Sequence, residues 1–134
     1  MSEENVENFL QAVEAFNRKD AEAFVALASP EVEWEDALFW SGVARTYRGR
    51  DELREWFNEV EEAWESIHVE VEEVTEAGDD RAFADLFLTG RGAGSGVETE
   101  LRVWQVNWFV DGKTARRRVF LERAEALEAA GLSE

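Results

Sequence analysis

The second half of the chain is patterned for β-strands almost throughout, and no other feature constrains the fold as strongly. Apolar residues alternate with polar ones, or run together with β-branched and aromatic residues, in four segments: 68–72, 81–89, 97–110 and 113–122. The glycine-rich stretch 90–96 and the dipeptide Asp111-Gly112 separate the last three segments, and Asp-Gly is a strong signal for a hairpin turn. The sequence therefore predicts a meander of four strands.

Helical patterns are confined to the first half of the chain and to its last residues. Apolar residues at helical spacing predict a helix over residues 3–17. Asp20 suits the N-cap of a second helix that stops at Ser29-Pro30, and a third helix is expected from about Asp51. A short helix rich in alanine and glutamate is expected before Gly131.

Helices that are segregated from a mainly antiparallel sheet define the α+β fold class. The chain has 134 residues and shows neither a repeat nor a linker, so residues 1–134 are expected to form one domain. The segment 97–110 is longer than most strands and has to bend. We therefore expect a curved sheet with helices packed on it around an internal cavity.

The charge balance excludes several classes of partner. Acidic residues outnumber basic ones 31 to 14, and the net charge of −17 disfavours nucleic acids and anionic membranes. The absence of cysteine and the single histidine, His68, argue against thiolate or multi-histidine metal sites and against a Ser-His triad. There is no basic leader and no apolar stretch of about 20 residues. We expect a cytoplasmic protein without cofactors that binds neither nucleic acid nor membrane.

Five segments carry a resemblance to a known family. In order, they are AVEAFNRKDAEAFVAL, PEVEWED, YRGRDELREWF, VEEVTEAGDD and DGKTARRRVFLERAEALEAAGL. Their order and spacing resemble the SnoaL-like branch of the nuclear transport factor 2-like superfamily. The resemblance implies a cone of three N-terminal helices packed on a curved sheet. The superfamily includes ketosteroid isomerases, polyketide cyclases, limonene-epoxide hydrolases, dehydratases and members without known chemistry, so the fold alone does not determine the function.

Asp36 is the strongest candidate for a catalytic residue. Strict alternation over residues 31–36 predicts a strand that places Val32, Trp34 and Asp36 on one inward face. A carboxylate beside indole rings is poorly solvated, so we expect its pKa to rise towards the range of a general base. The WED segment also resembles that of ketosteroid isomerases, whose Asp abstracts the proton next to a ketone. The alternative is an Asp that turns the chain into residues 37–50, which have no periodicity and are predicted as a loop.

Two amides are expected near the same cavity. Alternation over residues 97–110 places Val103, Gln105 and Asn107 on the face that lacks charge, where an amide can donate to a developing oxyanion. By resemblance, Gln105 stands where ketosteroid isomerases carry a protonated Asp, and Ala12 stands where they carry a donor Tyr. Both departures argue against steroid isomerase activity. The alternative role of the amides is hydrogen bonding that fixes the strands.

Arg117 is the candidate cation of the site. Alternation places Arg117 with Val119 and Leu121, so it points inward if those two residues do. A buried arginine requires a carboxylate or a ligand anion, and Asp36 is one possible partner. An Asp–Arg pair resembles the arrangement of the epoxide hydrolases, which add a second Asp, and no second inward Asp is expected on the neighbouring strands here. The alternative is a surface triplet, residues 116–118, that offsets the acidic excess.

The aromatic residues divide into two predicted sets. The first is expected to line a pocket for a flat apolar ligand, although each member is also an ordinary core residue: Trp34, Phe39, Trp40, Tyr47 and Trp56, together with the apolar Val103 and Val119. The second is expected on the outer sheet face as a homodimer interface: Phe83, Phe87, Trp104, Trp108 and Phe120. In that interface Asp85 would pair with Arg116 or Arg118. The alternative is that these aromatic residues belong to the core.

The expected function is the binding of a hydrophobic small molecule within the cone. If the protein is an enzyme, we expect cofactor-free isomerisation, cyclisation or dehydration of a carbonyl compound. Asp36 would then take the proton, Gln105 or Asn107 would hold the oxygen, and Arg117 would stabilise charge or orient Asp36. The alternatives are a non-catalytic binding or accessory dimeric domain, an epoxide hydrolase-like enzyme, and an oligomeric domain whose cavity its own side chains fill.

Overall fold

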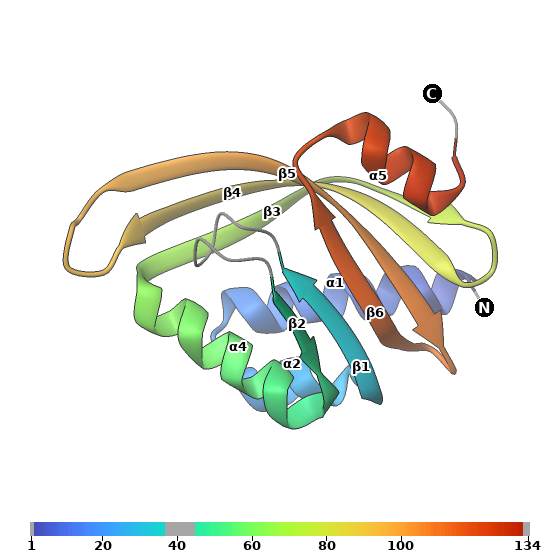
Figure 1. Cartoon of the computed structure of the whole chain (residues 1–134), viewed down its shortest axis with the longest axis horizontal. Coiled ribbons are helices and arrows are strands. Elements are labelled where there is room, and N and C mark those ends of the chain that lie inside the picture. Colours follow the sequence, from blue (N-terminus) through green and yellow to red (C-terminus); the bar gives the residue numbers. More distant parts are fainter. Residues whose placement is uncertain (1, 37–44, 133–134) are drawn as a thin grey trace.

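Six strands form one curved, unclosed sheet in the order β2-β1-β6-β5-β4-β3 (Figure 1). The computed structural model describes residues 2–36 and 45–132. Within them the strands are β1 (Ala28–Asp36), β2 (Arg45–Arg48), β3 (Trp64–Ala77), β4 (Arg81–Gly92), β5 (Glu98–Val110) and β6 (Lys113–Phe120). All adjacent pairs are antiparallel except β1 and β6, which run parallel. The α+β class, the meander from β3 to β6 and the curvature are as predicted.

The described segments contain four helices: α1 (Ser2–Asn17), α2 (Ala21–Ala26), α4 (Gly49–Ala63) and α5 (Arg123–Ala130). Helices α1, α2 and α4 lie on the concave side of the sheet, and α5 lies on the convex side (Figure 1). The prediction of three N-terminal helices is not matched. Helix α1 is the one long N-terminal helix, since α2 has six residues and α4 follows the first two strands.

Helix boundaries follow the predicted capping chemistry. The Asp20 side chain accepts a hydrogen bond from the Ala23 amide at 3.1 Å, which satisfies one of the free donors of the first turn of α2. At the C-terminus of α5, Gly131 adopts a left-handed φ of 79°, and the Leu132 amide donates to the Leu127 carbonyl. This geometry is a common way to end a helix, and glycine adopts it without steric cost.

Three local predictions are wrong at strand ends. The second helix ends at Ala26, and Pro30 lies inside β1, where the ladder with β6 is irregular between Ala28 and Glu33 and tolerates a residue that has no amide proton. Residues 45–48, predicted as loop, form the edge strand β2. Leu121 follows the end of β6 and is exposed, so it does not share the inward face of Val119.

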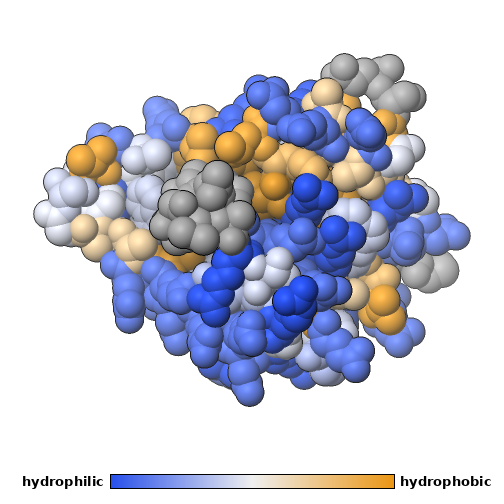
Figure 2. Space-filling model, viewed as in Figure 1, coloured by the Kyte–Doolittle hydropathy of each residue, from blue (hydrophilic) through white to orange (hydrophobic). Residues whose placement is uncertain are grey.

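The convex face is covered in part by the chain's own last helix. Phe83 and Phe120 are buried against Ala126 and Leu127 of α5, so part of the predicted dimer face is core. Phe87, Trp104 and Trp108 are half-buried on the same face. Figure 2 shows apolar side chains over the sheet next to α5, on a view that is otherwise mostly hydrophilic.

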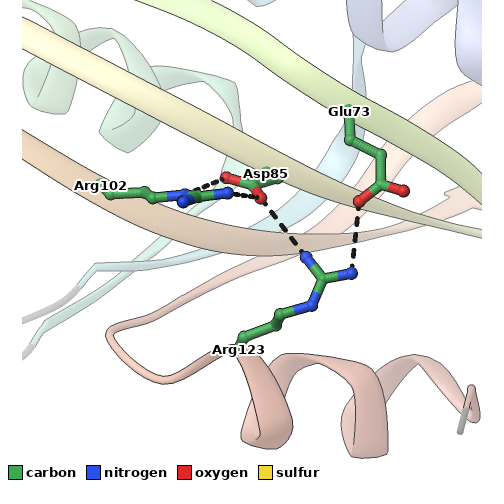
Figure 3. A network of polar contacts seen from close by, with 4 residues as sticks. All are labelled: Glu73, Asp85, Arg102 and Arg123. Carbon is green, nitrogen blue, oxygen red and sulfur yellow. Dashed lines mark hydrogen bonds and ion pairs between the residues drawn. The ribbon is translucent and has the colours of Figure 1, made fainter. Parts of the chain in front are cut away.

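A charged network anchors α5 to this face (Figure 3). The Asp85 carboxylate is 3% exposed and accepts hydrogen bonds from Arg102 Nε at 2.9 Å and Arg102 Nη2 at 2.6 Å. Arg123, the first residue of α5, donates to Asp85 at 3.3 Å and to Glu73 at 3.4 Å. Within the chain, Asp85 therefore pairs with Arg102 and Arg123 and not with Arg116 or Arg118.

Those two arginines instead lie on either side of Glu35 in the neighbouring strand, with Nε–Oε distances of 2.7 Å for Arg116 and 4.0 Å for Arg118. The register explains this, because Glu35 is paired with Arg118 in the parallel β1–β6 ladder and Glu33 is paired with Arg116. Asp85 lies on β4, on the far side of β5 from β6.

The contact between Trp64 and Gly90 gives a prediction about stability. A Cβ atom at Gly90 would lie 2.8 Å from Trp64 Cε3 and 3.0 Å from the Ser66 carbonyl oxygen. Gly90→Ala is therefore expected to lower the free energy of unfolding by about 1–3 kcal/mol through overpacking, measured by urea denaturation. In a Trp64→Ala background the same substitution should cost less, because only the contact with the Ser66 carbonyl remains. Equal stability of Gly90→Ala and the wild type would contradict this packing.

Candidate functional site

A cavity of about 60 Å³ lies between the helices and the concave face of the sheet. Its walls are almost wholly apolar, and Gln105 and Arg117 are the polar residues in its lining: Ala12, Val13, Phe16, Phe24, Trp34, Trp56, Val69, Leu86, Leu88, Val103, Gln105, Arg117 and Val119. A cavity needs about 10–15 Å³ to hold one water molecule, so this space exceeds that minimum. Aromatic rings fill much of the cone, with Trp34 and Trp56 only 5.1 Å apart between ring centres.

Arg117 forms the polar end of this cavity. It is 4% exposed, and its Nη1 atom donates to the Glu35 carbonyl at 2.8 Å and lies 3.6 Å from Asp36 Oδ1. Its guanidinium stacks over Trp34, with Cζ 4.1 Å from the ring centre, and lies 5.3 Å from that of Trp56. Burial lowers the pKa of Arg117 to about 10, an effect that the Asp36 carboxylate opposes. Arg117 is therefore a buried cation at neutral pH.

Asp36 lies at the end of β1, directly beside the cavity. Its carboxylate is 5% exposed, and Oδ2 accepts a hydrogen bond from Trp56 Nε1 at 2.9 Å. Asp36 is not itself among the cavity-lining residues, but it contacts two residues that are, Trp56 and Arg117. The structure thus brings together Asp36 and Trp34 of β1, Arg117 of β6 and Trp56 of α4, which sequence reasoning placed on three separate elements.

The two predicted amides belong to a chain of side-chain hydrogen bonds, referred to as the relay. The donor and the acceptor of each bond follow from the backbone carbonyl at one end of the relay. Asn8 Nδ2 donates to the Leu27 carbonyl, which can only accept, so Asn8 Oδ1 is the acceptor for Thr114 Oγ1. Asn107 Nδ2 then donates to Thr114 at 3.5 Å, and Gln105 Nε2 donates to Asn107 Oδ1 at 2.8 Å. The Oε1 atom and one N–H of Gln105 are not used in the relay, and Gln105 lines the cavity. Asn107 uses both of its polar atoms in the relay, as in the strand-fixing alternative.

The family follows from the sequence match. Residues 6–117 match the family model for the SnoaL-like domain, which is most of the chain. The chain belongs to the SnoaL-like domain family. No curated protein sequence matches this SnoaL-like domain.

Solved structures share the fold of this SnoaL-like domain. An NTF2-like protein of unknown function from Burkholderia pseudomallei has a TM-score of 0.79 and 22% identity, covering 93% of this chain and 95% of that one. TerC, co-crystallised with polyporic acid, has a TM-score of 0.79 and 21% identity over 96% and 98% of the two chains. RV0760c from Mycobacterium tuberculosis, in complex with estradiol-17beta-hemisuccinate, has a TM-score of 0.76 and 16% identity over 90% and 95%.

The remaining predicted pocket residues of the SnoaL-like domain are divided between cavity and core. Val103 and Val119 line the cavity. Tyr47 lies in the core outside the lining, where burial and the hydrogen bond it donates to Glu59 raise its pKa to about 12. Phe39 and Trp40 fall outside the described residues.

Sequence reasoning did not assign Phe16 and Phe24 to the site, although both line the cavity. Their helical spacing correctly indicated burial, but spacing along one helix does not show which part of a core faces a cavity. No group of three or more His, Asp or Glu side chains in the described segments is arranged to hold a metal ion. Over those same segments, no helix is long and apolar enough to cross a bilayer.

Proposed function

We propose that this SnoaL-like domain binds a hydrophobic carbonyl compound in its cone. The observation that carries the proposal is an apolar cavity with a cation and one amide as its polar groups. Small-molecule sites typically combine apolar walls with a few polar groups that orient the ligand. The ligands named for TerC and RV0760c, polyporic acid and estradiol-17beta-hemisuccinate, support a small-molecule role for this fold.

A second candidate function, acid–base catalysis, is favoured by the position of Asp36. A buried carboxylate held by Trp56 and Arg117 beside an apolar cavity has the character of a general base. In the proposed step, the carboxylate takes the proton from the carbon next to the carbonyl. The electron pair of that C–H bond forms the C=C bond of an enolate, and the π pair of the carbonyl group moves to its oxygen. Return of the proton to another atom completes an isomerisation, and loss of a leaving group completes a dehydration. No cofactor takes part in this step.

The two candidates predict different effects of Asp36→Asn. The amide keeps the shape of the carboxylate but does not take a proton, so we expect ligand binding within a few-fold of wild type and turnover lower by a factor of about 10²–10⁴. Binding of planar phenols, ketones and epoxides is measured by tryptophan fluorescence, and turnover by deuterium exchange at the ketone α-carbon.

The matched control is Glu35→Gln, which alters the adjacent carboxylate of the same strand and should leave both quantities unchanged. Equal exchange rates in Asp36→Asn and the wild type would reject catalysis by Asp36. Ligand binding without catalysis would then be the remaining candidate function. Absence of saturable binding across the panel would count against ligand binding itself and favour the filled, oligomeric alternative.

A further inference from the structure

Two buried N–H groups in the cavity walls have no acceptor. Within the described residues, neither Trp34 Nε1 nor Arg117 Nε has a hydrogen-bond partner, although both atoms are shielded from solvent. Folded proteins satisfy the great majority of buried donors, because an unpaired donor loses its hydration without compensation. Two such donors on adjacent residues of one cavity indicate a place for an acceptor that the protein does not supply.

The two residues are held side by side by the parallel ladder. Trp34 of β1 is paired with Arg117 of β6, and the guanidinium stacks on the indole at 4.1 Å. The Nη1 atom of Arg117 donates to the Glu35 carbonyl, whereas its buried Nε atom has no acceptor. An oxygen atom that reached both groups at this end of the cavity would accept hydrogen bonds from an arginine N–H and an indole N–H.

The charge balance distinguishes a neutral acceptor from an anion. Asp36 lies 3.6 Å from Arg117 and supplies one negative charge against its one positive charge. A carboxylate ligand would add a second negative charge to a buried site, in a chain whose net charge is already −17. A ketone oxygen accepts the same two hydrogen bonds without that penalty.

An apolar groove offers room for the rest of the ligand. It has a volume of about 250 Å³, shares Leu88 with the cavity, and is lined by Trp64, Ile67, Leu88, Thr89, Gly90, Thr99 and Leu101. In the β4–β5 ladder, Leu86 pairs with Val103 at the cavity, and Leu88 pairs with Leu101 in the groove. Gln105 and Leu101 are four residues apart on one strand face, which corresponds to roughly 13 Å. This part of the β4–β5 hairpin extends beyond the helices (Figure 1).

We infer that the ligand is a neutral, elongated carbonyl compound. Its oxygen accepts hydrogen bonds from Trp34 Nε1 and Arg117 Nε, and its apolar body extends along β4 past Leu88 into the groove. This inference rests on the proposed function and adds to it the identity of the oxygen-binding groups, the orientation of the ligand and its charge.

The test uses three probes with one ring system: 1-tetralone, its parent hydrocarbon tetralin, and 1,2,3,4-tetrahydro-1-naphthoate. Isothermal titration calorimetry with wild-type protein should give the highest affinity for the ketone, about tenfold above tetralin, because one or two net hydrogen bonds distinguish them. Trp34→Phe removes one donor and keeps an aromatic ring, so the ratio of ketone to hydrocarbon affinity should fall towards one. Arg117→Lys, which lacks the Nε donor, should act in the same direction.

Leu88→Ala serves as the matched control. It removes an apolar wall shared by the cavity and the groove without touching either donor, so it should weaken tetralone and tetralin by the same factor. An unchanged ketone-to-hydrocarbon ratio in folded Trp34→Phe and Arg117→Lys, or tighter binding of the carboxylate than of the ketone, would overturn the inference. Equal binding of ketone and hydrocarbon by the wild type would also overturn it but leave apolar ligand binding intact. Binding of none of the three would overturn the inference and count against the proposed function as well.

Discussion

Asp36→Ala is expected to lower the free energy of unfolding by about 3–5 kcal/mol, because it leaves Arg117 as a buried cation without its carboxylate. Both side chains of the pair are 5% exposed, so solvent cannot replace the lost partner. The double variant Asp36→Ala/Arg117→Met should recover most of this loss, since replacing a whole buried ion pair by apolar groups is often nearly neutral. Urea denaturation of Asp36→Ala, Arg117→Met and the double variant measures the coupling free energy between Asp36 and Arg117.

The control for this cycle is Glu35→Ala, which breaks the half-exposed pair with Arg116 on the other face of the same strand. Partly solvated pairs contribute only about 0–1 kcal/mol, so a small loss is expected. If Asp36→Ala cost no more than Glu35→Ala, or if the double variant were the least stable of all, Arg117 would not depend on Asp36 for its burial.

The second large effect is expected at Asp85. Hydrogen bonds from Arg102, opposed by burial, hold the pKa of Asp85 below its ordinary value of 3.8, and Arg123 adds to the lowering. A carboxyl whose pKa is lower in the folded state stabilises the fold above its unfolded pKa, and this contribution is lost as the pH falls through the folded value. Asp85→Asn should therefore cost about 2 kcal/mol at pH 7, and the difference from wild type should shrink below about pH 4.

Two measurements check this prediction. Urea denaturation at pH 7 and at pH 3 gives the pH dependence, and hydrogen exchange should show faster opening of α5, which loses the anchor of Arg123. Asp80→Asn is the control, because Asp80 is exposed and its contact with Arg81 is a surface pair. A stability difference for Asp85→Asn that stayed constant down to pH 3 would show that the charge of Asp85 is not what stabilises the fold.

Alternation predicted which face the candidate site residues of β1 and β5 occupy, and this part of the site followed from the sequence. Val32, Trp34 and Asp36 are inward on β1, as Gln105 and Asn107 are on β5, because a period of two is imposed by the backbone itself. The parallel pairing of β1 with β6, which puts Trp34 beside Arg117, was not predicted from periodicity, since periodicity within a strand carries no information about its neighbour.

The partners of charged residues were harder to predict, because periodicity does not show which elements become neighbours. The sequence placed Asp85 on the outer face but not under Arg123, because that contact depends on where α5 docks. Strand β2 was missed because four residues are too few to show a period, and its pairing with β1 defines it. The groove along β4 likewise depends on the length of the β4–β5 hairpin relative to the helices.

The parallel β1–β6 pair also determines when the site forms during synthesis. Glu35 and Arg117, which it joins, are 82 residues apart in the chain. At about 5–20 residues per second, a ribosome needs roughly 4–16 s to add that many residues. Until then β1 has only β2 as a sheet neighbour, and the aromatic residues of α1, α2 and α4 lack the wall that β4, β5 and β6 provide. The cavity is therefore among the last parts of the nascent protein to form. Throughout that interval Asp36 has been synthesised but its counterion, Arg117, has not.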